Sequence, residues 1–366
     1  MIRVLGCAAL LGMLSMPAPA WSEVTPKIKP VTAAKKHVPP VPDLPPQALK
    51  AADTYSIRHR GLALLVIQNN RILLEDYQEG SGQDVKHRIY SGTKGFWTLA
   101  GLAATEDGLL HLNEPVADTL PQWYVDPRKA PLCLCELLNF TSGLEPDFPL
   151  HGIDGSNRDT RAMRDKILAP RGQAFIYGPA AMQVFHEVLK HRLADWNETP
   201  TEYLERRVLY PLGLGPQRYL PDSDNNPLIA SGFMITAREW AAMGRCLLHR
   251  GWPILANNSL TPALRGSSVN PAYSLGFWNN HAVTAPDANE VDIEEMLELD
   301  WYRQNWSHAV LSLAAPPDLF ASIGSAGQRL YVVPSRNLVV VRLSRDSHFK
   351  DSEFLQCLFG NPQSLQ

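Results

Sequence analysis

The chain has 366 residues, enough for one large domain or two or three smaller ones, with a formal net charge of −3 and a sequence pI of about 6.4. Hydrophobic residues make up 45% and charged residues 19%, which is ordinary for a globular protein. No basic stripe indicates nucleic-acid binding and no long acidic run indicates a disordered tail, so we expect small-molecule partners and no nucleic acid.

Residues 1–20 have the pattern of a secretory signal peptide. Arg3 supplies the positive charge, residues 4–16 the apolar stretch, and Ala18-Pro-Ala20 a small-residue cleavage site. Leu5-Gly6-Cys7 resembles a lipoprotein cleavage box, but too few residues precede it to form an apolar region. The pattern therefore predicts export, and we expect the protein to be periplasmic or secreted.

Residues 21–46 are rich in Pro, Lys and Ala and cannot build a core. We expect them to form an extended linker, which offers one way of associating with the cell wall. Folded structure then begins with a predicted helix at 47–57, and a single domain spans 47–366. Two apolar runs at 62–68 and 71–77, separated by Asn69-Asn70, predict a β-hairpin.

From about residue 91 to about residue 260 the signals are mainly helical, and we expect a helical subdomain there. The clearest predicted helices cover 180–192, 200–208 and 236–249. The last of these opens with Thr-Ala-Arg-Glu, a capping box in which Thr236 and Glu239 would satisfy each other's backbone N–H groups.

The C-terminal part returns to strands. Runs at 319–323, 329–333 and 338–343 are strand-like, Pro334–Asn337 predicts the turn between the last two, and a helix at about 350–359 closes the chain. Strands at both ends with helices between them predict an α/β fold of layered α+β type, in which both chain ends assemble one sheet around a large helical insertion.

Four cysteines follow the predicted signal peptide. An exported protein meets oxidising conditions, so a disulfide between Cys246 and Cys357 is one option. Cys133 and Cys135 flank one leucine at a predicted helix start, where we expect two small buried residues rather than a redox or metal pair.

The candidate chemistry begins at Ser91-Gly-Thr-Lys94, because this motif and the apolar run after it predict a buried helix that starts at Ser91. Residues three apart share one face of a helix, so the Lys94 amine can lie beside the Ser91 hydroxyl. A desolvated lysine can take the proton that makes a serine nucleophilic. Ser347-His-Phe-Lys350 has the same spacing, but it reads as the polar start of the C-terminal helix.

Three later segments complete a pattern: Leu137–Leu144 closes a helix, Phe175–Pro179 stands before a helix, and Gly324–Pro334 opens a strand hairpin. In order and spacing the chain resembles the penicillin-recognising serine hydrolases, in the branch that holds class C β-lactamases, family VIII-type carboxylesterases and D-aminopeptidases. The resemblance runs from about residue 50 to 358. It implies a β-lactamase/transpeptidase-like fold with an antiparallel sheet.

The resemblance also implies roles for single residues. Ser91 would be the acyl-forming nucleophile and Lys94 its proton partner. Tyr177 would be the family's tyrosine, whose phenolate or neutral hydroxyl relays a proton to the leaving group. The backbone N–H groups of Ser91 and Ser325 would form the oxyanion hole, which stabilises charge that develops in the transition state.

Two departures from the family pattern bear on the substrate. After the tyrosine, many members carry a small residue and then Asn, whereas this chain has Gly178 and Pro179. The substrate-binding motif that usually begins with Lys or His is here Ser322-Ile323-Gly324. The chain thus lacks groups that would bind an amide and a carboxylate, which favours a neutral ester or a small amide over β-lactams and D-Ala-D-Ala peptides.

Several simpler interpretations compete with this one. Ser91 could be only a helix N-cap, Lys94 a solvated residue of the first turn, and Tyr177 a core aromatic. His186 and His191 could be considered as zinc ligands. They are five residues apart, however, whereas two ligands on one face of a helix require a spacing of four residues. We therefore expect no metal and no organic cofactor.

The sequence thus predicts an exported serine hydrolase that acts on an ester or a small amide through an acyl-enzyme. One alternative is a β-lactamase or D-Ala-D-Ala peptidase, and another is a non-catalytic relative that binds cell-wall material. Substrate recognition would lie in the loops at 145–164 and 284–306, where Trp301, Tyr302 and Trp306 suggest a pocket wall. The pattern specifies neither the substrate nor the oligomeric state.

Overall fold

The structure of the protein, a computed structural model, describes residues 41–152, 157–256, 259–345 and 348–360. The predicted signal peptide at 1–20 lies outside these residues, as does most of the predicted linker. Among the described residues, no helix is long and apolar enough to cross a membrane.

A seven-stranded sheet with the strand order β2-β1-β11-β10-β9-β6-β5 organises the described chain. Each neighbouring pair is antiparallel. Its strands are β1 (Gly61–Gln68), β2 (Arg71–Tyr77), β5 (Tyr273–Ser274), β6 (Phe277–Asn279), β9 (Phe320–Gly324), β10 (Gln328–Val333) and β11 (Leu338–Ser344). The first and last strands of the chain are side by side, with Leu65 opposite Val341. The prediction of one sheet built from both chain ends is therefore confirmed.

Two smaller sheets complete the strands. They pair β3 (His87–Arg88) with β4 (Met234–Ile235), and β7 (Asn289–Glu290) with β8 (Ala309–Val310). The helices are α1 (Pro46–Arg58), α2 (Thr93–Glu106), α3 (Leu134–Leu138), α4 (Arg158–Arg164), α5 (Pro179–Leu193), α6 (Pro200–Leu204), α7 (Ala237–Leu248), α8 (Ile293–Glu298) and α9 (Asp351–Phe359).

Local sequence accounts for several of these boundaries. Asn69 and Asn70 both have positive φ, of 51° and 60°, which is the conformation of the tight turn that joins β1 to β2. Thr236 and Glu239 form the predicted capping box at the start of α7. One predicted helix is shorter than expected, because α6 ends at Leu204 and continues as a π-helical turn at Glu205–Leu209.

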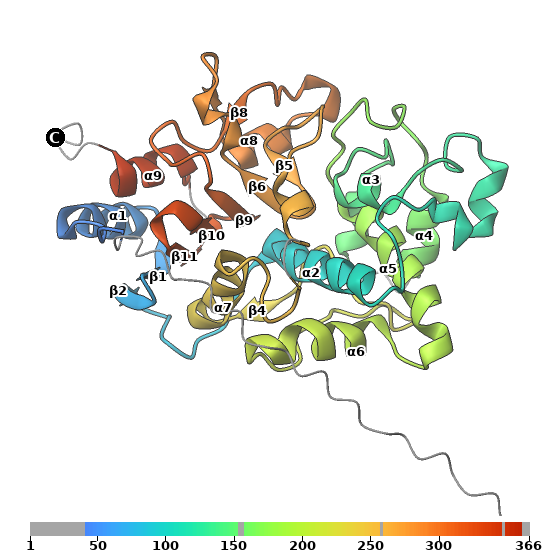
Figure 1. The fold of residues 1–366 in the computed structure, drawn as a ribbon, viewed down its shortest axis with the longest axis horizontal. Coiled ribbons are helices and arrows are strands. Elements are labelled where there is room, and N and C mark those ends of the chain that lie inside the picture. Colours follow the sequence, from blue (N-terminus) through green and yellow to red (C-terminus); the bar gives the residue numbers. More distant parts are fainter. Residues whose placement is uncertain (1–40, 153–156, 257–258, 346–347, 361–366) are drawn as a thin grey trace, which may run out of the picture. The chain divides into compact units, whose positions relative to one another are not determined.

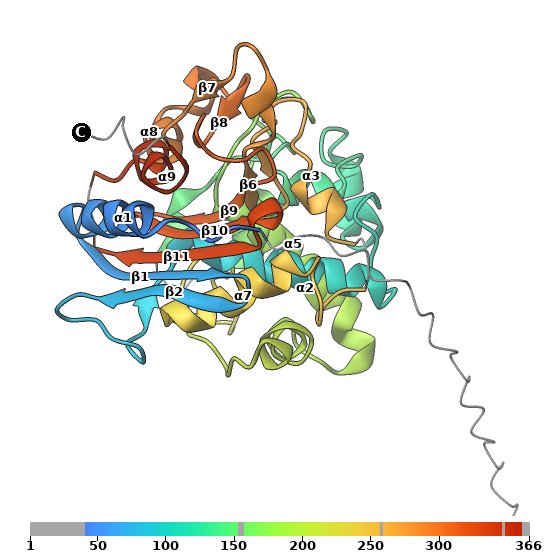
Figure 2. The same cartoon turned by 60° about the vertical axis from the view of Figure 1, so that its left-hand side comes forward.

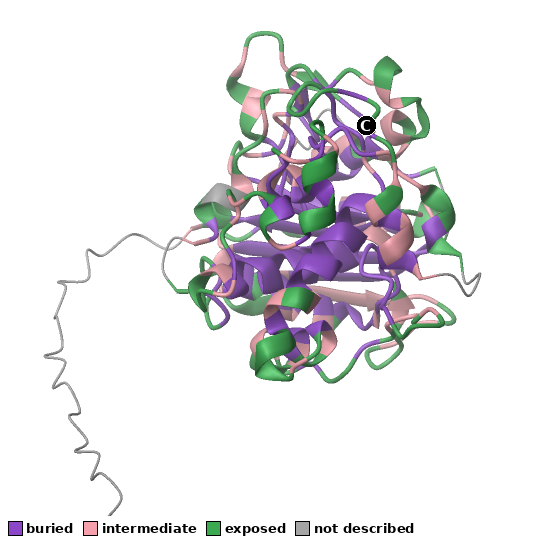
Figure 3. Cartoon of the chain, turned by 90° about the vertical axis from the view of Figure 1, so that its right-hand side faces the viewer, coloured by how far each residue is buried: buried purple, intermediate pink, exposed green. Residues whose placement is uncertain are grey.

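Helices cover both faces of the sheet. Helices α1 and α9, from opposite ends of the chain, pack together on one face, and α7 packs on the other against β1, β10 and β11 (Figures 1 and 2). The central strands β1, β10 and β11 between these layers are almost wholly buried, as Figure 3 shows, whereas edge strand β2 is partly exposed. Helix α2 belongs to the inserted helical region, and the 3-10 turn Tyr90–Gly92 that precedes it contacts β9.

The cysteines differ from expectation. Cys246 on α7 and Cys357 on α9 are both free and buried, on opposite faces of the sheet, so the disulfide considered between them is absent. A disulfide instead joins Cys133 and Cys135, which corrects the prediction of two independent buried residues. The chain passes there from an extended N-cap residue into α3, which brings the two Cα atoms to 5.4 Å, within the range that a disulfide bridges.

Candidate active site

Ser91 lies at the junction that the sequence indicated, but not on the first turn of an α-helix. It occupies the 3-10 turn η1 (Tyr90–Gly92), and α2 begins at Thr93. Tyr90, directly before the serine, has a φ of +44°, a conformation that is costly for a residue other than glycine and that tends to occur at functional sites. The N-cap of α2 is Gly92, so the N-cap interpretation of Ser91 is wrong.

Lys94 is the best-defined member of the site. Its side chain is only 2% exposed, and its Nζ donates to the Ser91 hydroxyl at 3.0 Å and to the Ala230 carbonyl at 2.9 Å. Burial lowers the pKa of Lys94 from 10.5 to about 7, because the charged form loses its hydration. A substantial fraction of the amine is then neutral near pH 7 and able to accept the serine proton. The interpretation of Lys94 as a solvated residue is wrong.

Tyr177 lies against the same pair. Lys94 Nζ is 4.6 Å from the centroid of the Tyr177 ring, and the ring packs against Phe140, Tyr273 and Trp278. Burial raises the pKa of Tyr177 above its usual range, although its contact with the Ser91 hydroxyl acts in the opposite direction. The phenol is therefore neutral at ordinary pH, which favours the proton-donating form of the two that the sequence left open.

The end of β9 lies next to the Ser91 turn, and Gly324 makes this approach feasible. A Cβ atom at Gly324 would stand 1.9 Å from the Ile89 carbonyl oxygen, so no larger residue fits there without a shift. Ser325 follows directly, and its backbone therefore lies close to the turn that carries Ser91. Ser322 faces inward, where its hydroxyl donates to the Gly92 carbonyl at 3.3 Å, and Ile323 is buried.

The segment after Tyr177 has a structural reason for its departure from the family pattern. A Cβ atom at Gly178 would lie 2.4 Å from the Pro146 Cβ, so this position must be glycine in this packing. Pro179 is the first residue of α5, where a missing backbone N–H costs nothing. The Gly-Pro pair thus fits the start of α5 against Pro146.

Two parts of the site had no signal in the sequence. The Ala230 carbonyl that binds Lys94 is a backbone group 136 residues away in the chain. The aromatic wall around Tyr177 combines Phe140, from the end of the helical motif, with Tyr273 and Trp278 from β5 and β6. Of the predicted wall residues, Trp306 packs against Phe175 and Trp278, whereas Tyr302 is 68% exposed.

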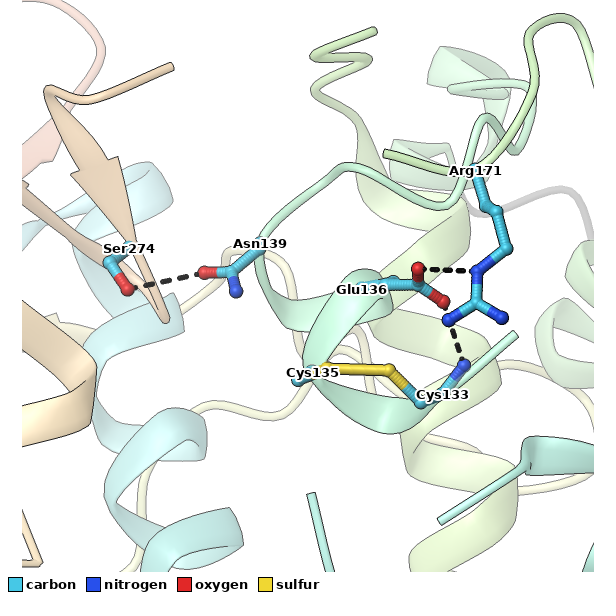
Figure 4. Close-up of a disulfide and its surroundings, with 6 residues drawn as sticks. All are labelled: Cys133, Cys135, Glu136, Asn139, Arg171 and Ser274. Atoms are coloured by element: carbon cyan, nitrogen blue, oxygen red, sulfur yellow. Dashed lines mark hydrogen bonds and ion pairs between the residues drawn. A yellow bond between two sulfur atoms is a disulfide. The ribbon is translucent and has the colours of Figure 1, made fainter. Parts of the chain in front are cut away.

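Helix α3 connects the disulfide at its start to β5, through Asn139 at its end (Figure 4). Glu136 accepts from the backbone N–H of Cys133 at 2.9 Å and forms an ion pair with Arg171 at 2.7 Å. At the other end of α3, Asn139 accepts from the Ser274 hydroxyl at 3.3 Å and from the Leu275 N–H at 2.8 Å. Asn139 therefore anchors α3 to β5. The next residue in the chain, Phe140, packs against Tyr177.

The two histidines that were considered as zinc ligands interact with carboxylates instead. His186 Nδ1 lies 2.8 Å from the buried carboxylate of Asp159, and His191 Nε2 lies 3.1 Å from Glu187. Across the part of the chain that the structure describes, no group of three or more His, Cys, Asp or Glu side chains could hold a metal ion.

Comparisons with known proteins identify the family and the fold. The family model described as "Beta-lactamase" matches residues 47–355. No curated protein matches the chain. Among solved structures, the chain is similar to a putative β-lactamase from Bacteroides dorei DSM 17855 (18% identity, TM-score 0.64, covering 86% of this chain and 97% of that one).

Two other similar structures are hydrolases that differ in their described activities. One is EstCE1, a hydrolase with promiscuous acyltransferase activity (16% identity, TM-score 0.62, covering 86% of this chain and 99% of that one). The other is a D-stereospecific amidohydrolase from Streptomyces sp. (14% identity, TM-score 0.60, covering 87% and 99%). At these identities the likeness establishes the fold, and the family model covers most of the chain: this protein belongs to the beta-lactamase family of hydrolases.

Proposed function

We propose that the protein is an exported serine hydrolase that cleaves an ester or a small amide through an acyl-enzyme on Ser91. The observation that carries the proposal is the buried Lys94 amine, 3.0 Å from the Ser91 hydroxyl, with a pKa of about 7. A non-catalytic binding protein has no need for a lysine that is desolvated against a serine, since burying an amine without a compensating charge is costly.

In the proposed first half-reaction, Ser91 Oγ attacks the substrate carbonyl carbon while neutral Lys94 accepts the hydroxyl proton. The carbonyl π electrons move onto oxygen, which the N–H groups of Ser91 and Ser325 would stabilise. As the oxyanion collapses, the bond to the leaving group breaks and Tyr177 supplies the proton, which Lys94 replaces. Water then attacks the acyl-enzyme by the same route, releasing the acid and restoring Ser91.

The substrate class follows from what surrounds Ser91. Ser322 stands where family members carry a cation, and its hydroxyl donates to Gly92. Pro179 has neither an amide side chain nor a backbone N–H to offer a substrate. These residues favour a substrate without a carboxylate at that position, hence a neutral ester or small amide, over a β-lactam or a D-Ala-D-Ala peptide.

The deciding experiment compares the mature protein with Ser91→Ala in hydrolysis of a p-nitrophenyl acetate-type ester and in intact-protein mass after reaction with a fluorophosphonate. We expect hydrolysis and one adduct in the unaltered protein, and neither in the variant. Ser307→Ala, an exposed serine remote in sequence from the motifs, is the matched control and should retain both. Full activity in Ser91→Ala would refute the mechanism.

A parallel incubation with a penicillin separates the related activities. A lasting penicillin adduct on Ser91, or turnover of the drug, would move the assignment to a penicillin-binding peptidase or a β-lactamase. An absence of every adduct and every turnover in the unaltered protein would instead support a non-catalytic relative.

A further inference from the structure

The turn after β9 holds the Ser325 N–H group in a backbone conformation that needs support. Ala326 and Gly327 both have positive φ, of 62° and 71°. For alanine this conformation is unfavourable by roughly 1 kcal/mol or more, so neighbouring contacts must hold it. The turn connects β9 to β10 directly, and Ser325 itself is exposed.

A single carboxylate makes those contacts. Glu294, on α8, accepts from the Ala326 N–H at 2.8 Å and from the Gly327 N–H at 3.0 Å, one with each oxygen. The same side chain forms an ion pair with Arg329 Nη2 at 2.9 Å. Hydrogen bonds from backbone N–H groups to an ionised carboxylate are stronger than bonds between neutral groups. Glu294 therefore fixes the turn on the side that follows Ser325.

Arg329 fixes the side that precedes it. Its guanidinium is fully buried, paired with Asp351 at 2.7 Å, and it donates through Nη1 to the Gly324 carbonyl at 2.9 Å. The Gly324 carbonyl and the Ser325 N–H belong to one peptide unit, and in a trans peptide they point in opposite directions. Anchoring the carbonyl on Arg329 therefore directs the Ser325 N–H away from Arg329 and polarises it as a donor.

We infer that Glu294 is a positioning residue for catalysis: together with Arg329 it holds the peptide that presents the Ser325 N–H to the oxyanion. The inference rests on the proposed function, because it assumes that an oxyanion forms beside Ser91. Glu294 does not reach the reacting atoms itself, so its loss should weaken transition-state stabilisation while leaving ground-state binding intact.

The test is Glu294→Gln in the mature protein, which keeps the shape but removes the charge that faces two N–H groups and a guanidinium. On an acetate ester we expect kcat to fall by about tenfold, with KM within about twofold of the unaltered protein. The affinity for a boronic acid, which mimics the tetrahedral adduct, should fall by the same factor. Rates are expressed per active site titrated with a fluorophosphonate, which removes any contribution from unfolded protein.

Glu295→Gln is the matched control, since this exposed neighbour lies on the same helix, while the carboxylate that accepts from the turn is that of Glu294. It should match the unaltered protein in all three measurements. If Glu294→Gln does not accumulate in folded form, Glu294→Asp, which keeps the charge but is one methylene shorter, is measured in its place with the same expectation.

The outcomes separate the two proposals. Turnover by the unaltered protein with equal kcat and boronic-acid affinity in the Glu294 and Glu295 variants would overturn the role of Glu294 alone. A rise in KM without a fall in kcat would also overturn it, because it would place Glu294 in substrate binding. Absence of turnover and labelling in the unaltered protein would overturn the proposed function and this inference with it.

Discussion

At the scale of single residues, burial makes Lys94 suitable as a base. A lysine in water keeps its proton far above neutral pH, but the side chain here is enclosed by α2, Tyr177 and the Ala230 carbonyl. The carbonyl and the serine hydroxyl are neutral partners, so they offset only part of the lost hydration of the ammonium ion. The result is an amine that titrates near pH 7 beside the candidate nucleophile.

This titration predicts a pH dependence. Because the neutral amine is the base, kcat/KM should rise as the pH increases through about 7, and it should level off above that value. At pH values well below 7, kcat/KM should fall about tenfold for each pH unit, since binding of one proton to Lys94 inactivates the site. The measurement is kcat/KM for an ester between pH 5 and pH 9, corrected for spontaneous hydrolysis.

A second side chain with a pKa near 7 requires a control variant. Burial raises the pKa of Asp165 to about 7 as well, with Asp147 and Glu145 adding to the effect. Asp165→Asn should leave the limb in place. If that variant removes the limb, the assignment of the titration to Lys94 is wrong.

At the scale of elements, the site depends on how closely β9 approaches the turn that carries Ser91. The two elements are far apart in the sequence. The Ser322 hydroxyl donates to the Gly92 carbonyl, and Gly324 meets the Ile89 carbonyl backbone to backbone. Such a contact has no room for adjustment by side-chain rotation, so a single methyl group should displace the strand.

Gly324→Ala should therefore reduce kcat/KM by about a hundredfold, because the Ser325 N–H would move with the strand. Overpacking of this kind should also lower the free energy of unfolding by about 1–3 kcal/mol. Activity assays and urea titrations measure the two effects. Gly215→Ala is the matched control, since an added Cβ there meets nothing within 4 Å, and it should change neither quantity appreciably.

Not all of the elements could be foreseen. Alternating and apolar runs located β1, β2, β9, β10 and β11, and the capping box located α7, because those signals are local. The start of α2 was missed by two residues, since Tyr90 has a positive φ that tyrosine seldom adopts and that its local propensity does not predict. The Cys133–Cys135 disulfide was missed because the sequence does not specify the turn that brings the two residues together.

At the scale of the whole molecule, a buried cluster of charges joins the last helix to the central sheet. Arg329 on β10 is fully buried and bonds Asp351 on α9 with two nitrogens, at 2.7 and 3.0 Å, while Tyr331 donates to the same carboxylate. The last helix is thereby fastened to the sheet, which also contains β1 and β2 from the N-terminal part of the chain. Removing one partner of such a pair leaves the other charge buried with less compensation.

Asp351→Asn should accordingly lower the free energy of unfolding by about 3 kcal/mol, as measured by urea denaturation. The control is Glu353→Gln, an exposed acid on the same helix, which should change stability by no more than about 0.5 kcal/mol. Equal stability of the two variants would show that the ion pair does not hold α9 on the sheet.

The sequence by itself determined the kind of fold and the candidate pair Ser91 and Lys94, because periodicity, turn residues and motif spacing are properties of short stretches. Tyr177 became a candidate through the resemblance to a known family. Only the tertiary structure decided that Lys94 is desolvated, that the Ala230 carbonyl is its partner, and that Glu294 and Arg329 hold the peptide before Ser325. The reason is physical: hydration loss and backbone hydrogen bonds depend on which distant segments meet, and no local pattern encodes that meeting.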